Sequence, residues 1–580
     1  MVLPLAIMIC LSAMPFLAQP AQAANPAPFF SISILAPNTN SARNQWATLM
    51  VEQLPKIGIG IDVFDHTGWS QISPRTWGHP GPYPIPTYAE GGFDILFVGW
   101  SWGLDWDPTG LFDSPSMPPN GDNFYQYDSQ EMDWAIYNYT SSFVLNDRIA
   151  WAEEIQALLY EDNPSACIIY PYSNYIHDPN FEGWDGLLWA SSYQPMENWS
   201  IAGQTEFHYA TPADFEDFHI YKYESVYDAQ WLSQIYNPLI ARDPTDPDYA
   251  YSPRLATSYS STDGLTYNII IDDDATWADG TDLTADDVEF SYGLQIDPDF
   301  GNPDQAFWEQ YLDGSSVVIN GPKDVDITFL QEYVFQEGNL ALDLVPEHIW
   351  GAILPEDMEQ QAVDWATSDP NKLMGAGPYY LEEYDGTNGV IHLVANPYFV
   401  DWYGADPIFD DIYFEFYSNK DGALSDLASG ALDMVDSQFS VQLDEIPTGT
   451  VNTLVNDPGT QEMAFNCEHP YLGTGELCPI PGWESGKNIR KAISSMIPRE
   501  VIVEEILGGL GRPGVTGCPS VAIGFDESLE PYEYSIALAK AYMEAAGFEY
   551  VIPTSTTGIG LYVVIGILAL AGASQVIFLK

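Results

Sequence analysis

The stretch GWSWGLDWDP, residues 99–108, places three tryptophans and two aspartates within ten residues. Indole faces stack on flat or ring-shaped ligands, and carboxylates accept hydrogen bonds from donor groups. We therefore expect such a cluster to hold a polar organic solute. The alternative is a tryptophan-rich core loop in which Asp107 and Pro108 form a turn.

Residues that would indicate an enzyme or a bound metal are scarce in the sequence. The pattern GxSxG occurs once, in GWSWG at residues 99–103, and such a match is weak by itself; there is no HExxH motif and no glycine-rich phosphate loop, and the chain has only 8 histidines. No pair of cysteines or histidines has the spacing of a zinc site. Runs of acids such as residues 272–274 are more typical of solvated turns than of a glycosidase pair. The sequence thus favours a binding protein that is not an enzyme and has no metal or cofactor, and an extracellular glycoside hydrolase remains the alternative.

Acidic residues greatly outnumber basic ones. There are 83 Asp and Glu against 17 Lys and Arg, which gives a formal net charge of −66. Because only 17% of the residues are charged, the imbalance is mainly a shortage of cations. Such a charge repels nucleic acid and suits a salty medium or the cell exterior, where ions screen self-repulsion. We expect no nucleic-acid partner.

Both ends of the chain carry targeting patterns. Residues 1–23 contain an apolar run followed by small residues at the positions of a signal-peptidase site, which predicts a secretory signal. Residues 558–579 carry no charge and are long enough to span a bilayer as a helix. We expect the protein at the cell surface, anchored in the membrane by this C-terminal helix after a linker, residues 549–557.

Four cysteines lie between the two targeting segments. Disulfides form outside the cell, and Cys467 and Cys478 enclose a short loop that contains Gly and Pro. We therefore favour a Cys467–Cys478 pair, although a disulfide is permitted rather than required.

The whole chain has 580 residues, which is long enough for two or three domains. Apolar, strand-like runs such as FFSISIL, DILFVGW and VIHLVA alternate with helix-like runs such as DRIAWAEEIQALLYED and SIALAKAYMEAAG. This alternation predicts an α/β fold in layers.

Several spaced motifs resemble one family. WADGTDLTADDVEFSY, residues 277–292, is similar to the signature of the family 5 extracellular solute-binding proteins, the dipeptide and oligopeptide receptors of ABC importers. Other stretches resemble the family in its own order: QIYNPLIARDP, PRLATSYSSTDGLTYNIII, LVPEHIW, GAGPYYLEEY, VANPYF, MAFNCEHP and NIRKAISSMIPREVIVEEILGGLGRP. The resemblance implies a two-lobed α/β fold of the periplasmic-binding-protein type, type II, cluster C.

The order of the segments departs from the family in one place. Family members continue from ALAKAYMEAAGF into a strand, a helix and a Gly-Trp stretch, whereas those segments stand here at the front of the chain, in residues 29–174. We interpret this order as a circular permutation with a new join near residues 193–206. Gene rearrangement or a tandem remnant is the alternative.

The permutation implies a domain map. A larger lobe would comprise residues 170–446, and a second lobe would combine residues 24–169 with residues 447–548. The chain would cross between the lobes near Tyr170 and Pro447, which would form the hinge. Permutation is plausible where old termini lie close together and the new break falls in a surface loop.

The family resemblance also implies a function. It predicts a monomeric receptor that captures a peptide or an oligosaccharide between its lobes and presents it to an ABC permease in the membrane. A cell-surface protein that kept the fold and lost its ligand is a further alternative. In relatives that bind peptides, an acid in the Gly-Trp stretch meets the ligand's amino group, so Asp105 or Asp107 is the candidate here.

Further site residues follow from the same resemblance. The tryptophans of the Gly-Trp stretch, Trp100, Trp102 and Trp106, would form walls of the site. Tyr236 and Asn466 match positions that face the cleft in the family, although core packing is the alternative role for both. Peptide-binding relatives place an arginine two residues before the Gly-Trp pair, where this chain has Phe97. That departure and the 14% aromatic content make a saccharide stacked on indoles as good a candidate as a peptide.

Overall fold

The computed structural model describes residues 25–38, 41–190, 196–223, 225–244, 246, 249–399 and 406–550. The expected signal, residues 1–23, the expected anchor, residues 558–579, and residues 551–557 of the linker lie outside these ranges. None of the helices within the described ranges has the length and hydropathy needed to span a bilayer.

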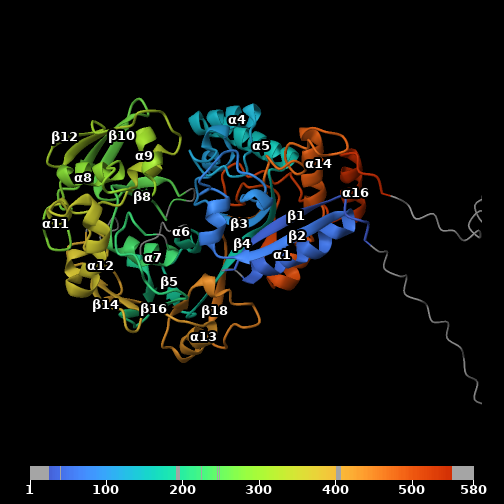
Figure 1. The fold of residues 1–580 in the computed structure, drawn as a ribbon. Coiled ribbons are helices and arrows are strands. Elements are labelled where there is room, and N and C mark those ends of the chain that lie inside the picture. The colour runs from blue at the N-terminus through green and yellow to red at the C-terminus, as the bar shows by residue number, and fades with distance from the viewer. Residues whose placement is uncertain are drawn as a thin grey trace, which may run out of the picture.

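The chain folds into two lobes of α/β structure, which lie side by side in Figure 1. One mixed sheet passes through both lobes, and among the described residues it has 12 strands, in the order β14-β15-β16-β7-β17-β4-β19-β3-β1-β2 with β18 and β20 also paired to β4. The alternation of strand-like and helix-like runs in the sequence therefore predicted the fold class correctly.

The second lobe, at the right of Figure 1, is built from both ends of the chain. Its strands are β1 (Phe30–Pro37), β2 (Ile59–Thr67), β3 (Ile95–Ser101), β19 (Gly459–Phe465), β20 (Gly511–Pro513) and the first part of β4 (Ser165–His177). Its helices are α1 (Ser41–Gln53), α2 (Trp69–Ile72), α3 (Thr109–Phe112), α4 (Gln130–Ser141), α5 (Leu145–Asp162), α14 (Trp483–Ser494), α15 (Arg499–Val501) and α16 (Ile536–Ala545).

The two ends of the chain share one sheet and one core in this lobe. Strand β19 pairs antiparallel with β3 along its whole length, from Gly459 opposite Ser101 to Phe465 opposite Ile95. Ile34 of β1 and Met543 of α16 belong to the same buried cluster. The segments before residue 170 and after residue 457 therefore form one structural unit, although almost 300 residues separate them in sequence.

The larger lobe, at the left of Figure 1, contains the rest of the large sheet and a smaller one. Strands of the large sheet here are β7 (Glu206–Thr211), β14 (Tyr379–Asp385), β15 (Val390–Ala395), β16 (Asp411–Phe416), β17 (Met434–Val435) and β18 (Val451–Asn456). The four-stranded sheet has β10 (Ala256–Ser261), β11 (Thr266–Ile271), β13 (Asp324–Thr328) and β12 (Val317–Gly321) in that order. Two short pairs complete the strands: β5 (Phe181–Glu182) with β6 (Ser200–Ile201), and β8 (Ile240–Arg242) with β9 (Tyr251–Pro253).

Helices of the larger lobe cover these sheets. They are α6 (Gly186–Ala190), α7 (Val226–Ile235), α8 (Ala285–Gln295), α9 (Gln305–Tyr311), α10 (Gln336–Leu340), α11 (Glu347–Trp350), α12 (Met358–Ser368) and α13 (Lys420–Ser429). The signature WADGTDLTADDVEFSY gives α8 a capping box. The Thr284 side chain accepts from the backbone N–H of Asp287, and the Asp287 carboxylate accepts from the backbone N–H of Thr284.

Strand β4 connects the lobes. Its first residues, Ser165–Ile169, pair with β19 of the second lobe, and its last residues, Tyr172–His177, pair with β18 of the larger lobe. The chain returns between β18 and β19, where the Ser173 hydroxyl donates to the Asp457 carboxylate at 2.7 Å. The two crossings therefore lie next to each other, an arrangement that permits hinge motion.

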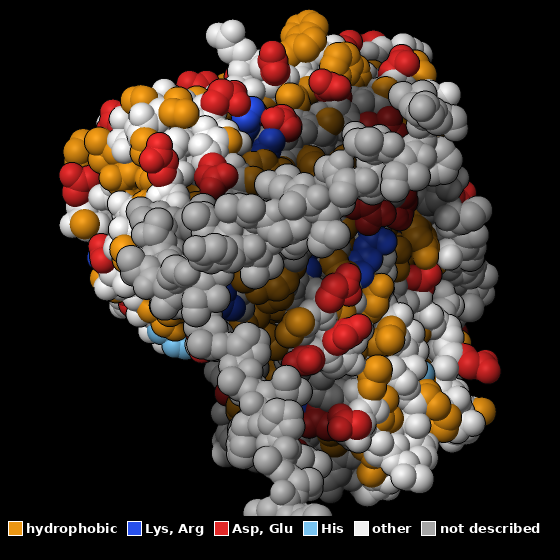
Figure 2. Space-filling view, turned by 90° about the vertical axis from the view of Figure 1, so that its right-hand side faces the viewer, with side chains coloured by type: hydrophobic (Ala, Val, Ile, Leu, Met, Phe, Trp, Pro, Cys, Tyr) orange, Lys and Arg blue, Asp and Glu red, His pale blue; other side chains and the backbone are white. Residues whose placement is uncertain are grey.

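The acidic composition is visible on the surface. Figure 2 shows acidic side chains spread over one face, with few basic side chains among them. The low number of cations makes each buried arginine informative, because an unpaired buried charge is costly.

Candidate functional site

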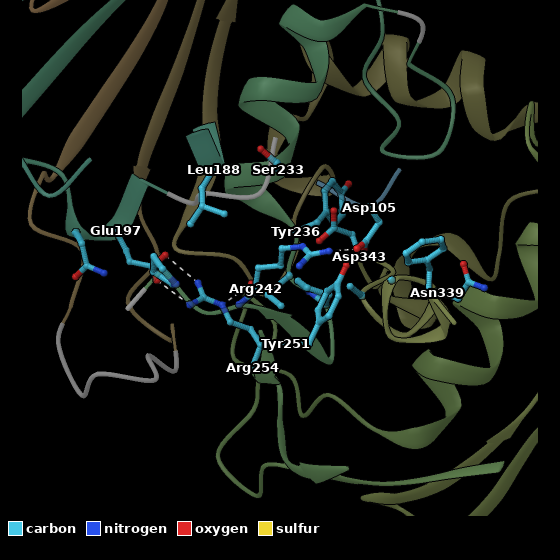
Figure 3. Close-up of a pocket in the computed structure, with 18 of the residues that line it drawn as sticks. Asp105, Leu188, Glu197, Ser233, Tyr236, Arg242, Tyr251, Arg254, Asn339 and Asp343 are labelled. Carbon is cyan, nitrogen blue, oxygen red and sulfur yellow. Dashed lines mark hydrogen bonds and ion pairs between the residues drawn. The ribbon is translucent and has the colours of Figure 1, made fainter. Parts of the chain in front are cut away.

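A cavity of about 380 Å³ lies where the two lobes meet (Figure 3). Its lining comes mainly from the larger lobe, from the segment that joins α7 to β9 and from the region of α10. The second lobe contributes Asp105, from the loop after β3. Cavities of this size, with aromatic walls and a few charged groups, are typical ligand sites.

Asp105 reaches the larger lobe through an ion pair with Arg242. The Arg242 side chain is held in place by two further contacts: its Nη1 donates to the Tyr249 carbonyl at 3.0 Å, and its guanidinium lies 4.4 Å from the Tyr251 ring centroid. Because Arg242 is the last residue of β8 in the larger lobe and Asp105 follows β3 in the second lobe, this ion pair joins the two lobes across the cavity.

Asp107 lies next to the cavity but does not line it. Its carboxylate accepts from the Thr109 backbone N–H at 2.9 Å, which forms the turn that the Asp-Pro sequence favours. It also accepts from the Tyr333 hydroxyl of the larger lobe at 2.7 Å. Burial and the charge of Asp107 raise the pKa of Tyr333, so its hydroxyl stays protonated and donates this second interlobe bond.

The three tryptophans of the Gly-Trp stretch are not among the residues that line the cavity. Trp106 is 1% exposed and packs in the core of the second lobe. Trp100 Nε1 donates to the Glu462 carboxylate at 2.9 Å, and Trp102 Nε1 donates to the Thr460 hydroxyl at 3.1 Å. The indoles therefore fasten the loop to β19, and Asp105 is the residue of the stretch that the fold directs into the cavity.

Tyr236 and Asn466 have different positions. Asn466 is fully buried, and its amide nitrogen donates to three backbone carbonyls, including that of Phe93 at 2.9 Å, while its oxygen accepts from Gln126 at 2.8 Å. Asn466 therefore holds the loops of the second lobe together and does not line the cavity. Tyr236 does line it, and its hydroxyl has no hydrogen-bond partner among the described residues.

Sequence reasoning missed the charged groups that the larger lobe supplies. Arg254 donates to both oxygens of Glu197, at 2.7 and 2.8 Å, and its Nε donates to the side-chain amide oxygen of Asn237 at 2.9 Å. Arg242 and Arg254 both lie within motifs that resemble the family. Because the whole chain has only 17 Lys and Arg, two arginines so close together are unusual for it. Two arginines within thirteen residues were the signal that could have indicated a charged site here.

Asp343 is the third carboxylate of the lining. Burial raises its pKa to about 7, against the opposing effect of the Arg254 charge. Nothing in the sequence around Asp343 distinguishes it from the many other acids of the chain.

The Cys467–Cys478 disulfide is not present in the structure, in which both residues are buried free thiols. The physical reason is that the two side chains pack into different cores. Cys467 lies in the cluster beneath the Gly-Trp loop, and Cys478 lies in the cluster formed by β1, α14 and α16. Burial raises the pKa of both thiols to about 11, so they remain protonated near neutral pH.

No group of three or more His, Cys, Asp or Glu side chains in the part of the chain that the structure describes has an arrangement that could hold a metal ion. Among the charged groups of the cavity, Asp105 is paired with Arg242 and Glu197 with Arg254.

Comparison with known proteins identifies the family. Residues 250–561 match the family described as "Bacterial extracellular solute-binding proteins, family 5 Middle". The chain belongs to this family. Family 5 proteins are extracellular, non-enzymatic binding receptors with a two-lobed α/β fold.

Individual family 5 relatives match only part of the chain. The oligopeptide-binding protein AppA of Bacillus subtilis is 26% identical over 316 residues, which cover 53% of each chain. The periplasmic murein peptide-binding protein MppA of Escherichia coli is 26% identical over 318 residues, 51% of this chain and 55% of MppA. The chain thus spans about half the length of the curated relatives it matches.

Solved structures of family 5 proteins also align in part. The structure of Bacillus subtilis AppA in complex with a nonapeptide covers 61% of this chain and 66% of its own, with 20% identity and a TM-score of 0.44. That of Escherichia coli MppA covers 60% and 67%, with 18% identity and a TM-score of 0.42.

Proposed function

We propose that this protein is the extracellular substrate-binding receptor of an ABC importer, and that it captures a peptide or an oligosaccharide between its lobes and delivers it to a membrane permease. The observation that carries the proposal is the cavity between the lobes, with Asp105 of one lobe paired to Arg242 of the other. Membership of family 5 supports the receptor class, and the names of AppA and MppA concern peptides.

Capture follows from closure of the two lobes. A ligand that contacts both lobes lowers the free energy of the closed state by those contacts. Three bonds already join the lobes near the cavity: the Asp105–Arg242 ion pair, the Tyr333–Asp107 hydrogen bond, and a backbone bond from Val334 N–H to the Thr140 carbonyl at 2.9 Å. A ligand in the cavity would add its contacts to these.

The lining is compatible with both ligand classes. Tyr251, Tyr333 and Phe335 offer aromatic faces on which a sugar ring can stack. Arg242 and Asp105 offer opposite charges that a peptide's termini can meet. The three tryptophans that were expected as walls do not line the cavity, so they offer no stacking face to a ligand there.

We also propose that the chain is circularly permuted. The sequence predicts the larger lobe at residues 170–446 and the second lobe at residues 24–169 and 447–548; because β18 (Val451–Asn456) pairs with the part of β4 that belongs to the larger lobe, we place the return between the lobes near Asp457 instead of Pro447. The ring of Phe29 lies 5.0 Å from that of Phe548 and 5.2 Å from that of Tyr550, so the segments that family members join directly are neighbours in space. Both ends of the described chain lie at the same side of the second lobe (Figure 1). A linear alignment restricted to about half of each relative is what a changed segment order produces.

Export and anchoring complete the proposal. The signal at residues 1–23 and the anchor at residues 558–579 would place the receptor on the cell surface, and residues 549–557 would hold it close to the membrane. This part rests on the sequence patterns and on the extracellular nature of family 5.

Thermal unfolding in the presence of candidate ligands tests the receptor function. A ligand at a hundred times its Kd stabilises the folded state by about 2.7 kcal/mol, so tripeptides or maltotriose should raise the Tm of the purified protein. Asp105→Ala should weaken that rise because it removes the second lobe's contact with the cavity, whereas Asp385→Ala, in an exposed turn of β14, should not. Turnover of an added ligand, or no response to either class, would contradict the proposal.

A further inference from the structure

The carboxylates that line the cavity are not equally engaged. Asp105 is paired with Arg242, and Glu197 is paired with Arg254. Asp343 is the remaining carboxylate, and within the described ranges its side chain forms no hydrogen bond or ion pair. The cavity therefore holds two arginines and three carboxylates, and it lacks one positive charge whenever Asp343 is ionised.

The backbone fixes Asp343 beside Tyr236. Residues Pro238 and Asp343 form an antiparallel bridge, and the Leu344 N–H donates to the Asn237 carbonyl at 3.1 Å. The Tyr221 hydroxyl donates to the backbone carbonyl of Asp343 itself. The position of this carboxyl group is thus set by the fold before any ligand binds, as a specific site requires.

Two further polar groups of the same lining are left without partners. Tyr236 is 1% exposed and Asn339 is 7% exposed, yet the Tyr236 hydroxyl and the Asn339 amide nitrogen have no hydrogen-bond partner among the described residues. Both residues and Asp343 line the cavity, and in Figure 3 Asn339 lies to the right of Tyr236 and Asp343. Because a buried polar group without a partner costs free energy, these groups indicate where ligand atoms belong.

We propose that Asp343, Tyr236 and Asn339 form a subsite for a primary ammonium group that stands next to an oxygen acceptor. The Asp343 carboxylate and the Tyr236 hydroxyl oxygen accept from the ammonium group, and the Asn339 amide donates to the neighbouring oxygen. This subsite rests on the proposed receptor function and deepens it, because it favours a ligand with a free amino group, such as the amino terminus of a peptide, over a neutral oligosaccharide.

Asp343 is better suited to this role than Asp105. An ammonium group at Asp105 must compete with the Arg242 guanidinium for the same carboxylate, and displacement would break the ion pair that joins the two lobes. At Asp343 a cation meets a carboxylate with no ion pair to break. One added positive charge then balances the lining.

The subsite makes binding depend on pH. The charged and titratable groups around Asp343 come from two neighbouring cavities that it lines. In the cavity between the lobes they are Arg242, Arg254, Asp105, Glu197, Tyr236, Tyr251 and Tyr333, and in the neighbouring cavity they are Tyr221, Tyr223 and Asp304. Burial raises the pKa of Asp343 to about 7, so the carboxyl group is neutral in acid and charged in base. Since the ammonium group binds the charged form, affinity should be full above about pH 8 and fall about tenfold per pH unit below 7.

The test measures ligand-induced shifts in Tm and Kd by calorimetry between pH 5.5 and 8.5, with three probes: a tripeptide mixture with free amino termini, the same mixture after N-acetylation, and maltotriose. We expect the free tripeptides to bind and acetylation to abolish binding. Asp343→Asn should weaken binding by about tenfold or more and remove its pH dependence. Asp385→Asn is the matched control, since Asp385 lies at the end of β14, outside the linings of this cavity and of the neighbouring one, and should leave binding unchanged.

Other outcomes separate this inference from the proposed function. If maltotriose binds and the tripeptides do not, or if Asp105→Asn abolishes the dependence on a free amine while Asp343→Asn does not, the ammonium subsite is wrong and the receptor function stands. If no probe of either class binds, the receptor function fails and the subsite fails with it. Should Asp343→Asn not fold, Tyr236→Phe replaces it, and unchanged binding of free tripeptides by that variant contradicts the subsite.

Discussion

At the scale of single residues, the pairing of scarce cations shapes the cavity. The side chains of Arg254 and Glu197 are 1% and 4% exposed, and they form an ion pair that is almost completely shielded from water. Such a pair contributes little net stability over an apolar pair of the same shape, but removal of one partner leaves a buried charge. The Arg254–Glu197 pair therefore fixes the wall of the cavity, and its loss should lower the free energy of unfolding because one charge stays buried.

This reasoning predicts the effect of Glu197→Gln. The variant should lower the free energy of unfolding by about 3 kcal/mol, because the Arg254 guanidinium loses its counter-charge inside the protein. Urea unfolding followed by tryptophan fluorescence measures the change. Glu445→Gln is the control, because its ion pair with Lys420 has side chains that are 37% and 27% exposed and should contribute less than about 1 kcal/mol. Equal losses in the two variants would contradict the prediction.

Single site residues were only partly predictable from the sequence. Asp105 and Tyr236 lie in motifs whose residue types indicate binding, and both line the cavity. The same motifs contain Trp106 and Asn466, which the fold buries in the second lobe. A one-dimensional pattern does not tell which side chains of a loop face the core, and Asp343 has no local pattern at all.

At the scale of elements, the signature WADGTDLTADDVEFSY acts through Asp287 at the start of α8. Its carboxylate accepts from the Thr284 N–H at 2.8 Å, from the Glu347 N–H at 2.9 Å and from Trp277 Nε1 at 3.3 Å. One side chain therefore ties the beginning of α8 to the preceding turn and to the beginning of α11. The neighbouring Asp286 is exposed.

The two adjacent acids give a matched pair of variants. Asp287→Ala should lower the free energy of unfolding by about 2 kcal/mol, because buried N–H groups lose an ionised acceptor. Asp286→Ala should cost less than about 1 kcal/mol, since it removes only a favourable charge at the helix N-terminus. Thermal and urea unfolding of both proteins test the difference. A larger loss for Asp286→Ala would show that the charge near the helix end matters more than the capping bonds.

Element prediction succeeded where periodicity and end signals agreed. The run DRIAWAEEIQALLYED corresponds to α5, and VIHLVA corresponds to β15. The family-like stretch NIRKAISSMIPREVIVEEILGGLGRP is divided between two helices, because α14 ends at Ser494 and Pro498 precedes a new start at Arg499. The passage of β4 from one lobe to the other is a tertiary feature that local sequence does not encode.

At the scale of the whole molecule, chain order and fold can be separated. Phe29 and Tyr550 have rings 5.2 Å apart, so a linker of about six Gly and Ser residues, which reaches roughly 13 Å, can join them. Residues 202–204 form an exposed turn between β6 and β7, at the end of the expected join. A chain that begins at Gln204, runs to Tyr550, continues through the linker into Phe29 and ends at Gly203 would have the segment order of the family.

If the chain is a circular permutation, this rearranged chain should fold to the same structure. No strand or helix is interrupted, and the contact between the two ends of the second lobe becomes covalent, so its Tm should lie within about 5 °C of that of the natural order. Circular dichroism, thermal unfolding and ligand binding provide the comparison. A chain opened instead between Ile168 and Ile169, both 1% exposed in β4, should not unfold cooperatively, because that cut separates the two parts of the strand that joins the lobes. Failure of the first chain to fold would mean that the closeness of the two ends does not reflect interchangeable segment order.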